Sequence, residues 1–284
     1  MDHGQVTNLG AIYLPMNPPE RLPEVARIAD RAGLEQLWLW EDCFLNSGIA
    51  AASAALACTE RLRVGIGLMP APFRNVALAA MEIATLHRLF GDRPIAGIGH
   101  GVQEWMAQVG ARAESPMTLL REYTTALRSL LHGEEVTTDG RYVHLDAVKL
   151  DWPPSSPPSL LIGATGPKTL QLAGELADGT ILTAGTSPEG VRTAVTNIRP
   201  DARHDVVVFM MVETGPGAAE RLAAQQEKSG GWGVAGDAAA IAEGVESIAA
   251  AGATTVVLQP TESNTPPPGE FVRFVAEEVR PLVG

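Results

Sequence analysis

Acid–base side chains follow two short apolar segments of the sequence. Glu41 and Asp42 come directly after "LWLW" at 37–40, and His100 follows "PIAGIG" at 94–99. Carboxylates and an imidazole at such positions can accept hydrogen bonds or transfer a proton. Alternatively, one carboxylate caps the helix that follows and the other is solvated. All three are titratable groups at the end of an apolar segment, which makes them the candidates for proton transfer.

Glycines at alternate positions surround this histidine. The stretch "PIAGIGHGVQEWMAQVG" at 94–110 carries Gly97, Gly99 and Gly101 before a helix-like segment. Glycine leaves room for another group beside the backbone and permits positive φ, but it costs conformational entropy. Three of them indicate that something comes close to this backbone, although a tight turn between a strand and a helix is the simpler alternative.

A second glycine-rich turn contains one of only three lysines in the chain. Gly163-Ala164-Thr165-Gly166 is followed by Pro167, and Lys168 and Thr169 fall in the first turn of the expected helix. Free N–H groups and the positive end of the helix dipole make such a turn an anion site. The glycine spacing is too short for the nucleotide-binding loop of NTPases. We therefore expect a phosphate site here, with a plainly capped helix as the alternative.

These turns must be positioned by strands and helices, and the hydrophobic pattern alternates between the two. The expected strands are 9–14, 36–40, 62–68, 95–98, 160–162, 180–182, 206–212 and 255–258. The expected helices are 18–32, 49–58, 76–90, 102–109, 116–131, 218–228 and 237–251, with three more beginning at Pro167, at Pro188 and near Glu270.

Eight apolar strands that alternate with helices predict a (β/α)8 TIM barrel, with a doubly wound open sheet as the rival. An excursion over about 102–158, with a hairpin signal at Asp139-Gly140, predicts an insertion after strand 4 of a single domain covering 1–284. In a barrel, all three turns lie at the C-terminal ends of the strands, where active sites are built. The irregular path around Gly67, after strand 3, lies at the same face.

Composition excludes several classes of protein. The 284 residues are 45% hydrophobic and 19% charged with a net charge of -12, so nucleic acid is not an expected partner. No apolar run reaches the length of a membrane span, and the first ten residues do not resemble a leader peptide, which together predict a cytoplasmic protein. Cys43 and Cys58 lack the spacing of a zinc site, so no metal is expected.

Four stretches resemble the bacterial luciferase-like superfamily, and within it the branch that uses the deazaflavin coenzyme F420. In chain order they are "WLWEDCF", "RLRVGIGLMPAPFRNVALAAMEIATLHRLFGDRPIAGIGHGVQEWMAQVGA", "LLIGATGPKTLQLAGELADG" and "GDAAAIAEGVESIAAAGATTVVLQP". The resemblance covers roughly residues 9–260. It implies a (β/α)8 barrel with an insertion and a cofactor ring lying across the barrel mouth.

The resemblance also implies roles for particular residues. Gly67-Leu68 matches a bulge with a non-prolyl cis peptide behind the ring, Glu41 matches an acidic position that hydrogen-bonds the cofactor, and the turn 163–168 matches the phosphate loop. The implied cofactor-binding set is Glu41, Gly67, Leu68, Gly99, His100, Gly101, Gly163, Ala164, Thr165, Gly166, Lys168 and Thr169.

These matches predict an F420-dependent oxidoreductase that transfers a hydride between the deazaflavin and an organic substrate. Asp42 or His100 supplies the proton that this chemistry needs. An FMN-dependent monooxygenase and a flavin-binding protein without catalysis are the alternatives. Val102 stands where sugar-phosphate-oxidising members carry a catalytic glutamate, so a sugar phosphate is not the expected substrate. The resemblance further implies a homodimer.

Overall fold

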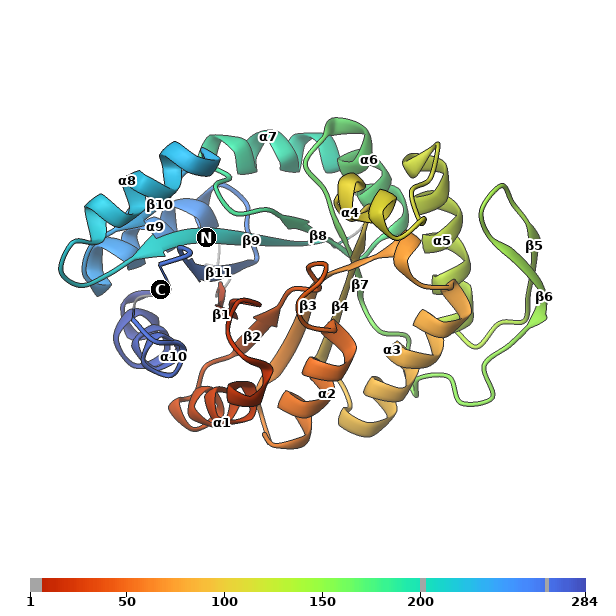
Figure 1. The fold of residues 1–284 in the computed structure, drawn as a ribbon, viewed down its shortest axis with the longest axis horizontal. Coiled ribbons are helices and arrows are strands. Elements are labelled where there is room, and N and C mark those ends of the chain that lie inside the picture. The colour runs from red at the N-terminus through yellow and green to blue at the C-terminus, as the bar shows by residue number, and fades with distance from the viewer. Residues whose placement is uncertain (1–6, 200–202, 264–265) are drawn as a thin grey trace.

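Eight parallel strands form a closed barrel (Figure 1). The computed structural model describes residues 7–199, 203–263 and 266–284. The first six residues, which belong to the stretch that does not resemble a leader peptide, lie outside these ranges. In order around the barrel, each strand pairs with the next and the last pairs with the first. The strands are β1 Asn8–Tyr13, β2 Gln36–Leu39, β3 Arg63–Pro70, β4 Pro94–Gly99, β7 Leu160–Gly163, β8 Gly179–Leu182, β9 Asp205–Glu213 and β11 Thr255–Pro260. This closure confirms the predicted TIM barrel and excludes the open sheet.

Helices surround the barrel because each presents one apolar face to the strands. In α1, for example, the buried residues Leu22, Val25 and Ala29 recur at helical spacing. The longer helices are α1 Leu22–Ala32, α2 Gly48–Ala57, α3 Val76–Phe90, α5 Pro116–Leu131, α6 Pro167–Leu176, α7 Pro188–Ile198, α8 Ala218–Ser229, α9 Ala238–Ala250 and α10 Pro268–Phe274. Short 3-10 turns cover Pro19–Arg21, Ala71–Phe73 and Arg280–Leu282, and a π-helical turn covers Val275–Val279. None of the helices in the described ranges is both long and apolar enough to cross a bilayer.

The stretch after β4 departs from the simple alternation. It contains the short helix α4 Gln103–Gln108, then α5, then a hairpin of β5 Val136–Asp139 and β6 His144–Val148 at one edge of the molecule. Because α5 packs against both α3 and α6, it is the regular outer helix of this barrel unit. The additions to the barrel are therefore α4 and the hairpin. A further short strand, β10 Gly233–Ala235, pairs with the end of β9 beyond the reach of β8.

The barrel interior is filled by large side chains. Trp38, Phe209 and Ile181 belong to an inner cluster that is separate from the larger core between strands and helices. Trp38 is fully buried, and a Cβ atom on Gly65 would lie only 2.4 Å from its ring. The inward Trp38 thus closes the barrel below the C-terminal mouth and leaves that mouth to hold a ligand.

Candidate active site

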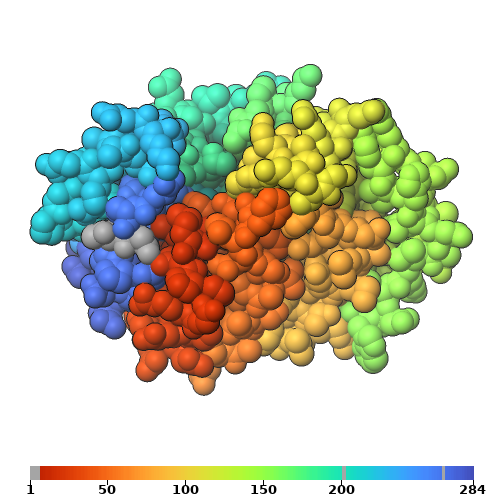
Figure 2. Space-filling view, in the orientation of Figure 1, coloured from red at the N-terminus to blue at the C-terminus, as the bar shows by residue number. Residues whose placement is uncertain are grey.

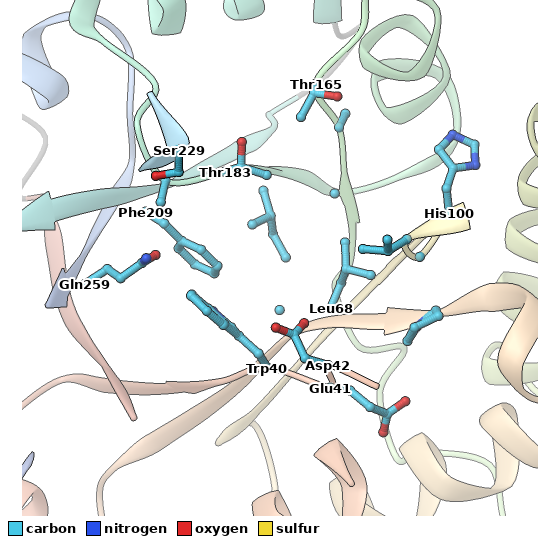
Figure 3. Close-up of a pocket in the computed structure, with 18 of the residues that line it drawn as sticks. Trp40, Glu41, Asp42, Leu68, His100, Thr165, Thr183, Phe209, Ser229 and Gln259 are labelled. Atoms are coloured by element: carbon cyan, nitrogen blue, oxygen red, sulfur yellow. The ribbon is translucent and has the colours of Figure 1, made fainter. Parts of the chain in front are cut away.

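A cavity of about 630 Å³ lies at the C-terminal ends of the strands, a size typical of small-molecule sites (Figure 3). In the space-filling view the surface is hollowed between α8 and the segment that follows β4 (Figure 2). The predicted residues that line it are Glu41, Asp42, Gly67, Leu68, His100, Gly101, Gly163, Ala164, Thr165 and Thr169. Gly99, Gly166 and Lys168 lie outside the lining, although their neighbours in the chain belong to it.

The irregularity at the end of β3 is the one that the sequence predicts. The peptide bond between Gly67 and Leu68 is cis, and the pairing of β3 with β4 shifts register between Ile66 and Met69. The predicted non-prolyl cis peptide at the bulge is confirmed. A second one, between Cys43 and Phe44 after β2, was not predicted.

The alternate glycines of β4 make room for side chains from other strands of the barrel. A Cβ atom on Gly97 would lie 2.5 Å from Ile181 Cδ1, and one on Gly99 would lie 2.6 Å from Leu68 Cδ2. Gly101, with φ +68°, takes the left-handed conformation of the turn that follows. Something does come close to this backbone, as expected, and at Gly97 and Gly99 it is the side chains of β8 and β3. A cofactor contact at Gly99 stays a prediction.

Asp42 points into the cavity (Figure 3). Its carboxylate has no hydrogen-bond or ion-pair partner among the described residues. Burial raises the pKa of Asp42 above its ordinary value, since desolvation penalises the charged form. A carboxyl group with a raised pKa carries its proton over a wider pH range, which suits a general acid.

Both carboxylate oxygens of Glu41 are bonded to other groups of the protein. Its Oε1 lies 2.7 Å from Arg74 Nη1, and its Oε2 accepts hydrogen bonds from Arg74 Nη2 at 2.9 Å and from the Gly48 N–H at 2.8 Å. Arg74 also pairs with Glu82, with 3.2 Å between Nε and Oε2. The predicted hydrogen bond from Glu41 to the cofactor stays a prediction, and the ion pair gives this carboxylate a structural role.

His100 lies at the opposite side of the cavity from Asp42 in Figure 3 and contacts the first turn of α6. Its Nε2 lies 3.2 Å from Thr169 Oγ1, whose hydroxyl donates to Met117 Sδ. The hydroxyl oxygen is therefore free to accept a hydrogen bond from Nε2. Burial lowers the pKa of His100, with the Pro116 carbonyl opposing that shift, so the imidazole favours its neutral form.

The first turn of α6 presents backbone donors beside the cavity. Gly166 is its N-cap residue with no capping side chain, and Pro167 occupies the first helical position. The N–H groups of the first turn have no partners within a helix. Lys168 is exposed and forms no ion pair with any described residue. Together these groups form the positive end that the predicted anion site requires.

Sequence reasoning missed the contributions of Trp40, after β2, and of β8, β9 and β11 to the cavity wall, which α8 completes. Two signals were available: an aromatic residue, Trp40, at the end of an apolar strand, and a polar residue, Gln259, within the apolar end of another. The lining residues on this side are Trp40, Ile181, Phe209, Met211, Gln225, Ser229 and Gln259.

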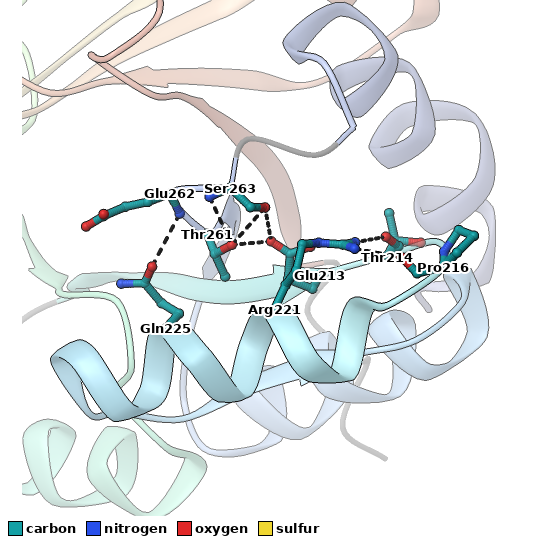
Figure 4. Close-up of polar contacts among 8 residues, drawn as sticks. All are labelled: Glu213, Thr214, Pro216, Arg221, Gln225, Thr261, Glu262 and Ser263. Carbon is teal, nitrogen blue, oxygen red and sulfur yellow. Dashed lines mark hydrogen bonds and ion pairs between the residues drawn. The ribbon is translucent and has the colours of Figure 1, made fainter.

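A buried carboxylate holds this wall together (Figure 4). Glu213, at the end of β9, is 1% exposed and accepts hydrogen bonds from Arg221 Nε at 2.7 Å, from the Ser263 hydroxyl at 2.9 Å and from the Thr261 hydroxyl. Arg221, on α8, also donates to the carbonyls of Thr214 and Pro216. The network ties α8 to the ends of β9 and β11, and so fixes the position of the cavity wall.

Fold and site together define a TIM-barrel protein whose ligand cavity opens where barrel enzymes carry their active sites. The family model for the luciferase-like monooxygenases matches residues 3–228, and the chain belongs to that family. The predicted resemblance is thereby confirmed.

Two relatives are a reductase and an F420-dependent dehydrogenase. The 5,10-methylenetetrahydromethanopterin reductase of Methanolobus tindarius is 31% identical over 195 residues, which cover 68% of this chain and 59% of the relative. An F420-dependent glucose-6-phosphate dehydrogenase of Microbacterium testaceum is 30% identical over 186 residues, covering 60% and 54%. The chain thus spans less than two thirds of the length of these relatives.

Solved structures share the fold over nearly the whole chain. The F420-dependent tetrahydromethanopterin reductase of Methanopyrus kandleri superposes with a TM-score of 0.84 at 21% identity, covering 98% of this chain and all of that one. An F420-dependent secondary alcohol dehydrogenase, bound to an F420-acetone adduct, gives a TM-score of 0.85 at 18% identity, with the same coverage.

Proposed function

We propose that this protein is an F420-dependent oxidoreductase acting on an organic substrate. The observation that carries the proposal is the first turn of α6, whose uncapped backbone donors lie beside a cavity that also holds the unpaired Asp42. The F420 dependence of the glucose-6-phosphate dehydrogenase that is 30% identical to this chain supports the choice of cofactor.

The residues present fit such a cofactor. Gly163, Ala164 and Thr165 line the cavity with little side-chain bulk, and the adjoining N–H groups of α6 and Lys168 would hold a phosphate. Gly67 and Leu68 would support the ring. When bound, the deazaflavin supplies hydride transfer, which no side chain provides.

The chain itself must orient the substrate and manage a proton. Reduction of a carbonyl, imine or alkene leaves an anion that must be protonated. We assign this step to Asp42, because its carboxyl group is directed into the cavity and its raised pKa favours the protonated form. His100 favours the neutral form and is held by Thr169, so we assign it to the cofactor side of the cavity.

Spectroscopic titration tests the proposal. F420 should bind and FMN should bind much more weakly. Replacing Lys168 with Ala should weaken F420 binding by about 5- to 150-fold, equivalent to ~1–3 kcal/mol for a lost charged hydrogen bond. Lys149→Ala is the matched control, since Lys149 is also exposed but follows β6 and does not belong to the first turn of α6. Tighter binding of FMN, with oxygen consumption, would make the protein a monooxygenase. Cofactor binding without turnover of any substrate would make it a non-catalytic flavin-binding protein.

We also propose that the protein is a homodimer. Leu78, Met81 and Leu89 on α3 are 48%, 57% and 68% exposed and lie on one side of the helix. The neighbouring α2 adds small exposed residues, Ala50 and Ala54, beside this apolar face. Such a face is typical of a protein interface. Light scattering should give twice the chain mass, and Met81→Glu should give a monomer; a monomeric parent protein would refute the proposal.

A further inference from the structure

The cavity has a second end, distinct from the α6 turn. In Figure 3, Thr165 and His100 lie at one side, whereas Trp40, Phe209 and Gln259 gather at the other. Trp40 follows β2, Phe209 lies in the middle of β9, and Gln259 lies near the end of β11. Phe209 abuts the bulge of β3, because a Cβ atom on Gly67 would lie 2.8 Å from Phe209 Cζ.

Aromatic rings at this end are held in place by one another. The ring of Phe209 stacks on that of Trp40, with 6.4 Å between centroids and 22° between planes. On another side, Phe209 meets the fully buried Trp38 edge to face, with 5.5 Å between centroids and 70° between planes. A fixed aromatic wall of this kind favours a flat, apolar ligand over a flexible one.

Two polar groups beside this wall lack partners. Trp40 Nε1 is buried without a hydrogen-bond acceptor, and Gln259 Oε1 is buried without a donor, as judged over the described residues. Leaving such groups unpaired costs free energy. An indole donor and an amide acceptor at one end of a cavity are suited to a ligand edge that offers an acceptor and a donor together.

The cavity offers no positive charge to such a ligand. Neither lysine nor arginine is among its described lining residues, and the nearby Arg74 is paired with Glu41 and Glu82. Asp42 is directed into the same space. A carboxylate or phosphate bound here would lack a counter-ion and would meet a carboxylate, which disfavours anionic substrates.

We infer that this end is the substrate subsite, and that it takes an uncharged, flat, ring-containing molecule with an amide-type edge. Trp40 donates to the carbonyl oxygen of that edge, and Gln259 accepts from its N–H. The inference rests on the proposed function, because it names the substrate class for the hydride transfer proposed above.

Calorimetric titration of the F420-loaded protein with three probes tests it. The probes are 2-quinolone, a flat lactam; coumarin, which has the same shape but no N–H; and quinoline-2-carboxylate, which is anionic. The lactam should bind about 3- to 10-fold more tightly than coumarin, as expected for one hydrogen bond. The carboxylate should bind at least about 10-fold more weakly than the lactam.

Two variants separate the contacts. Gln259→Leu should bring the ratio of lactam to coumarin affinity close to one. Trp40→Phe keeps a ring but removes the N–H donor, and should weaken both neutral probes by about 3- to 10-fold. Trp152→Phe is the control, because Trp152 is 70% exposed and lies outside the cavity lining.

The two proposals fail in different ways. F420 fluorescence measures cofactor binding independently and should be unchanged in the Trp40 and Gln259 variants. Without F420 binding the proposed function fails, and the same probes are then titrated into the cofactor-free protein. With F420 bound, absent lactam binding, equal affinity for the carboxylate, or unchanged probe affinities in both variants would overturn the substrate inference alone.

Discussion

Replacing Arg74 with Met should destabilise the protein strongly. Arg74 and Glu41 form a buried pair, since their side chains are 11% and 4% exposed, and Glu82 is 24% exposed. Removal of the guanidinium leaves two carboxylates facing each other without a cation. Breaking a buried ion pair from one side costs about 3–5 kcal/mol in the free energy of unfolding, because the remaining charge is desolvated and unpaired.

A double-mutant cycle isolates this coupling. Glu41→Gln keeps an oxygen that can accept from the Gly48 N–H but removes the charge. The Glu41→Gln/Arg74→Met protein should be more stable than Arg74→Met alone, with an interaction energy of about 2 kcal/mol or more. Urea denaturation of the four proteins measures it. The reasoning would be refuted if the effects of the two substitutions on the free energy of unfolding were additive, or if Arg74→Met lowered that free energy by less than about 0.5 kcal/mol.

The destabilisation should also depend on pH. Burial already raises the pKa of Glu82, Arg74 opposes that shift, and Glu41 adds to it. Without Arg74, the folded-state pKa of Glu82 lies further above its unfolded value, so folding takes up a proton. The free energy of unfolding of the Arg74→Met protein, compared with that of the parent, should therefore recover as pH falls from about 7 towards about 5. A deficit that stays constant over this range would contradict the assignment of the cost to unpaired carboxylates.

Three further predictions concern the site and its walls. Asp42→Asn should slow single-turnover substrate reduction by about 10²- to 10⁴-fold. In the parent, the rate of this reduction should fall as pH rises through the raised pKa of Asp42, and the variant should not show this fall; an unchanged pH profile would exclude Asp42 as the acid. Gly163→Ala should lower the free energy of unfolding by about 1–3 kcal/mol in the same denaturation assay, because the new Cβ atom would lie 2.1 Å from Leu68 Cδ2. Adding Leu68→Ala should restore part of this loss, and a double variant no more stable than Gly163→Ala would place the strain elsewhere. Glu213→Ala should cost about 3–5 kcal/mol in thermal or urea unfolding by leaving Arg221 without its carboxylate, and a loss below about 1 kcal/mol would show that the network does not hold α8.

The barrel could be predicted because its signals are local. Each strand is a short apolar run bounded by turn residues, and each outer helix shows one apolar face, so the order of elements is visible in the sequence. The predicted strand at 206–212 became β9 with only its ends shifted. The bulge at Gly67-Leu68 was predictable from the resemblance, since periodicity says nothing about cis peptides.

Side-chain contacts between residues that are far apart in the sequence could not be predicted from such local patterns. Glu41 meets Arg74, 33 positions away, and a carboxylate at a strand end does not reveal whether its partner is a ligand or the protein itself. Trp40 and Phe209 lie far apart in the sequence, and in the middle of an apolar strand nothing shows that Phe209 faces the cavity rather than the core. β10 was missed because three residues carry no measurable alternation.

The site beside α6 is tested most directly by a crystal structure of the protein with F420 bound. We predict that the cofactor phosphate lies within hydrogen-bond distance of the N–H groups in the first turn of α6, and that the deazaflavin lies against Gly67-Leu68 with Asp42 on its substrate side. A well-ordered cofactor with its phosphate away from residues 163–169, or with its ring away from the bulge of β3, would contradict the account.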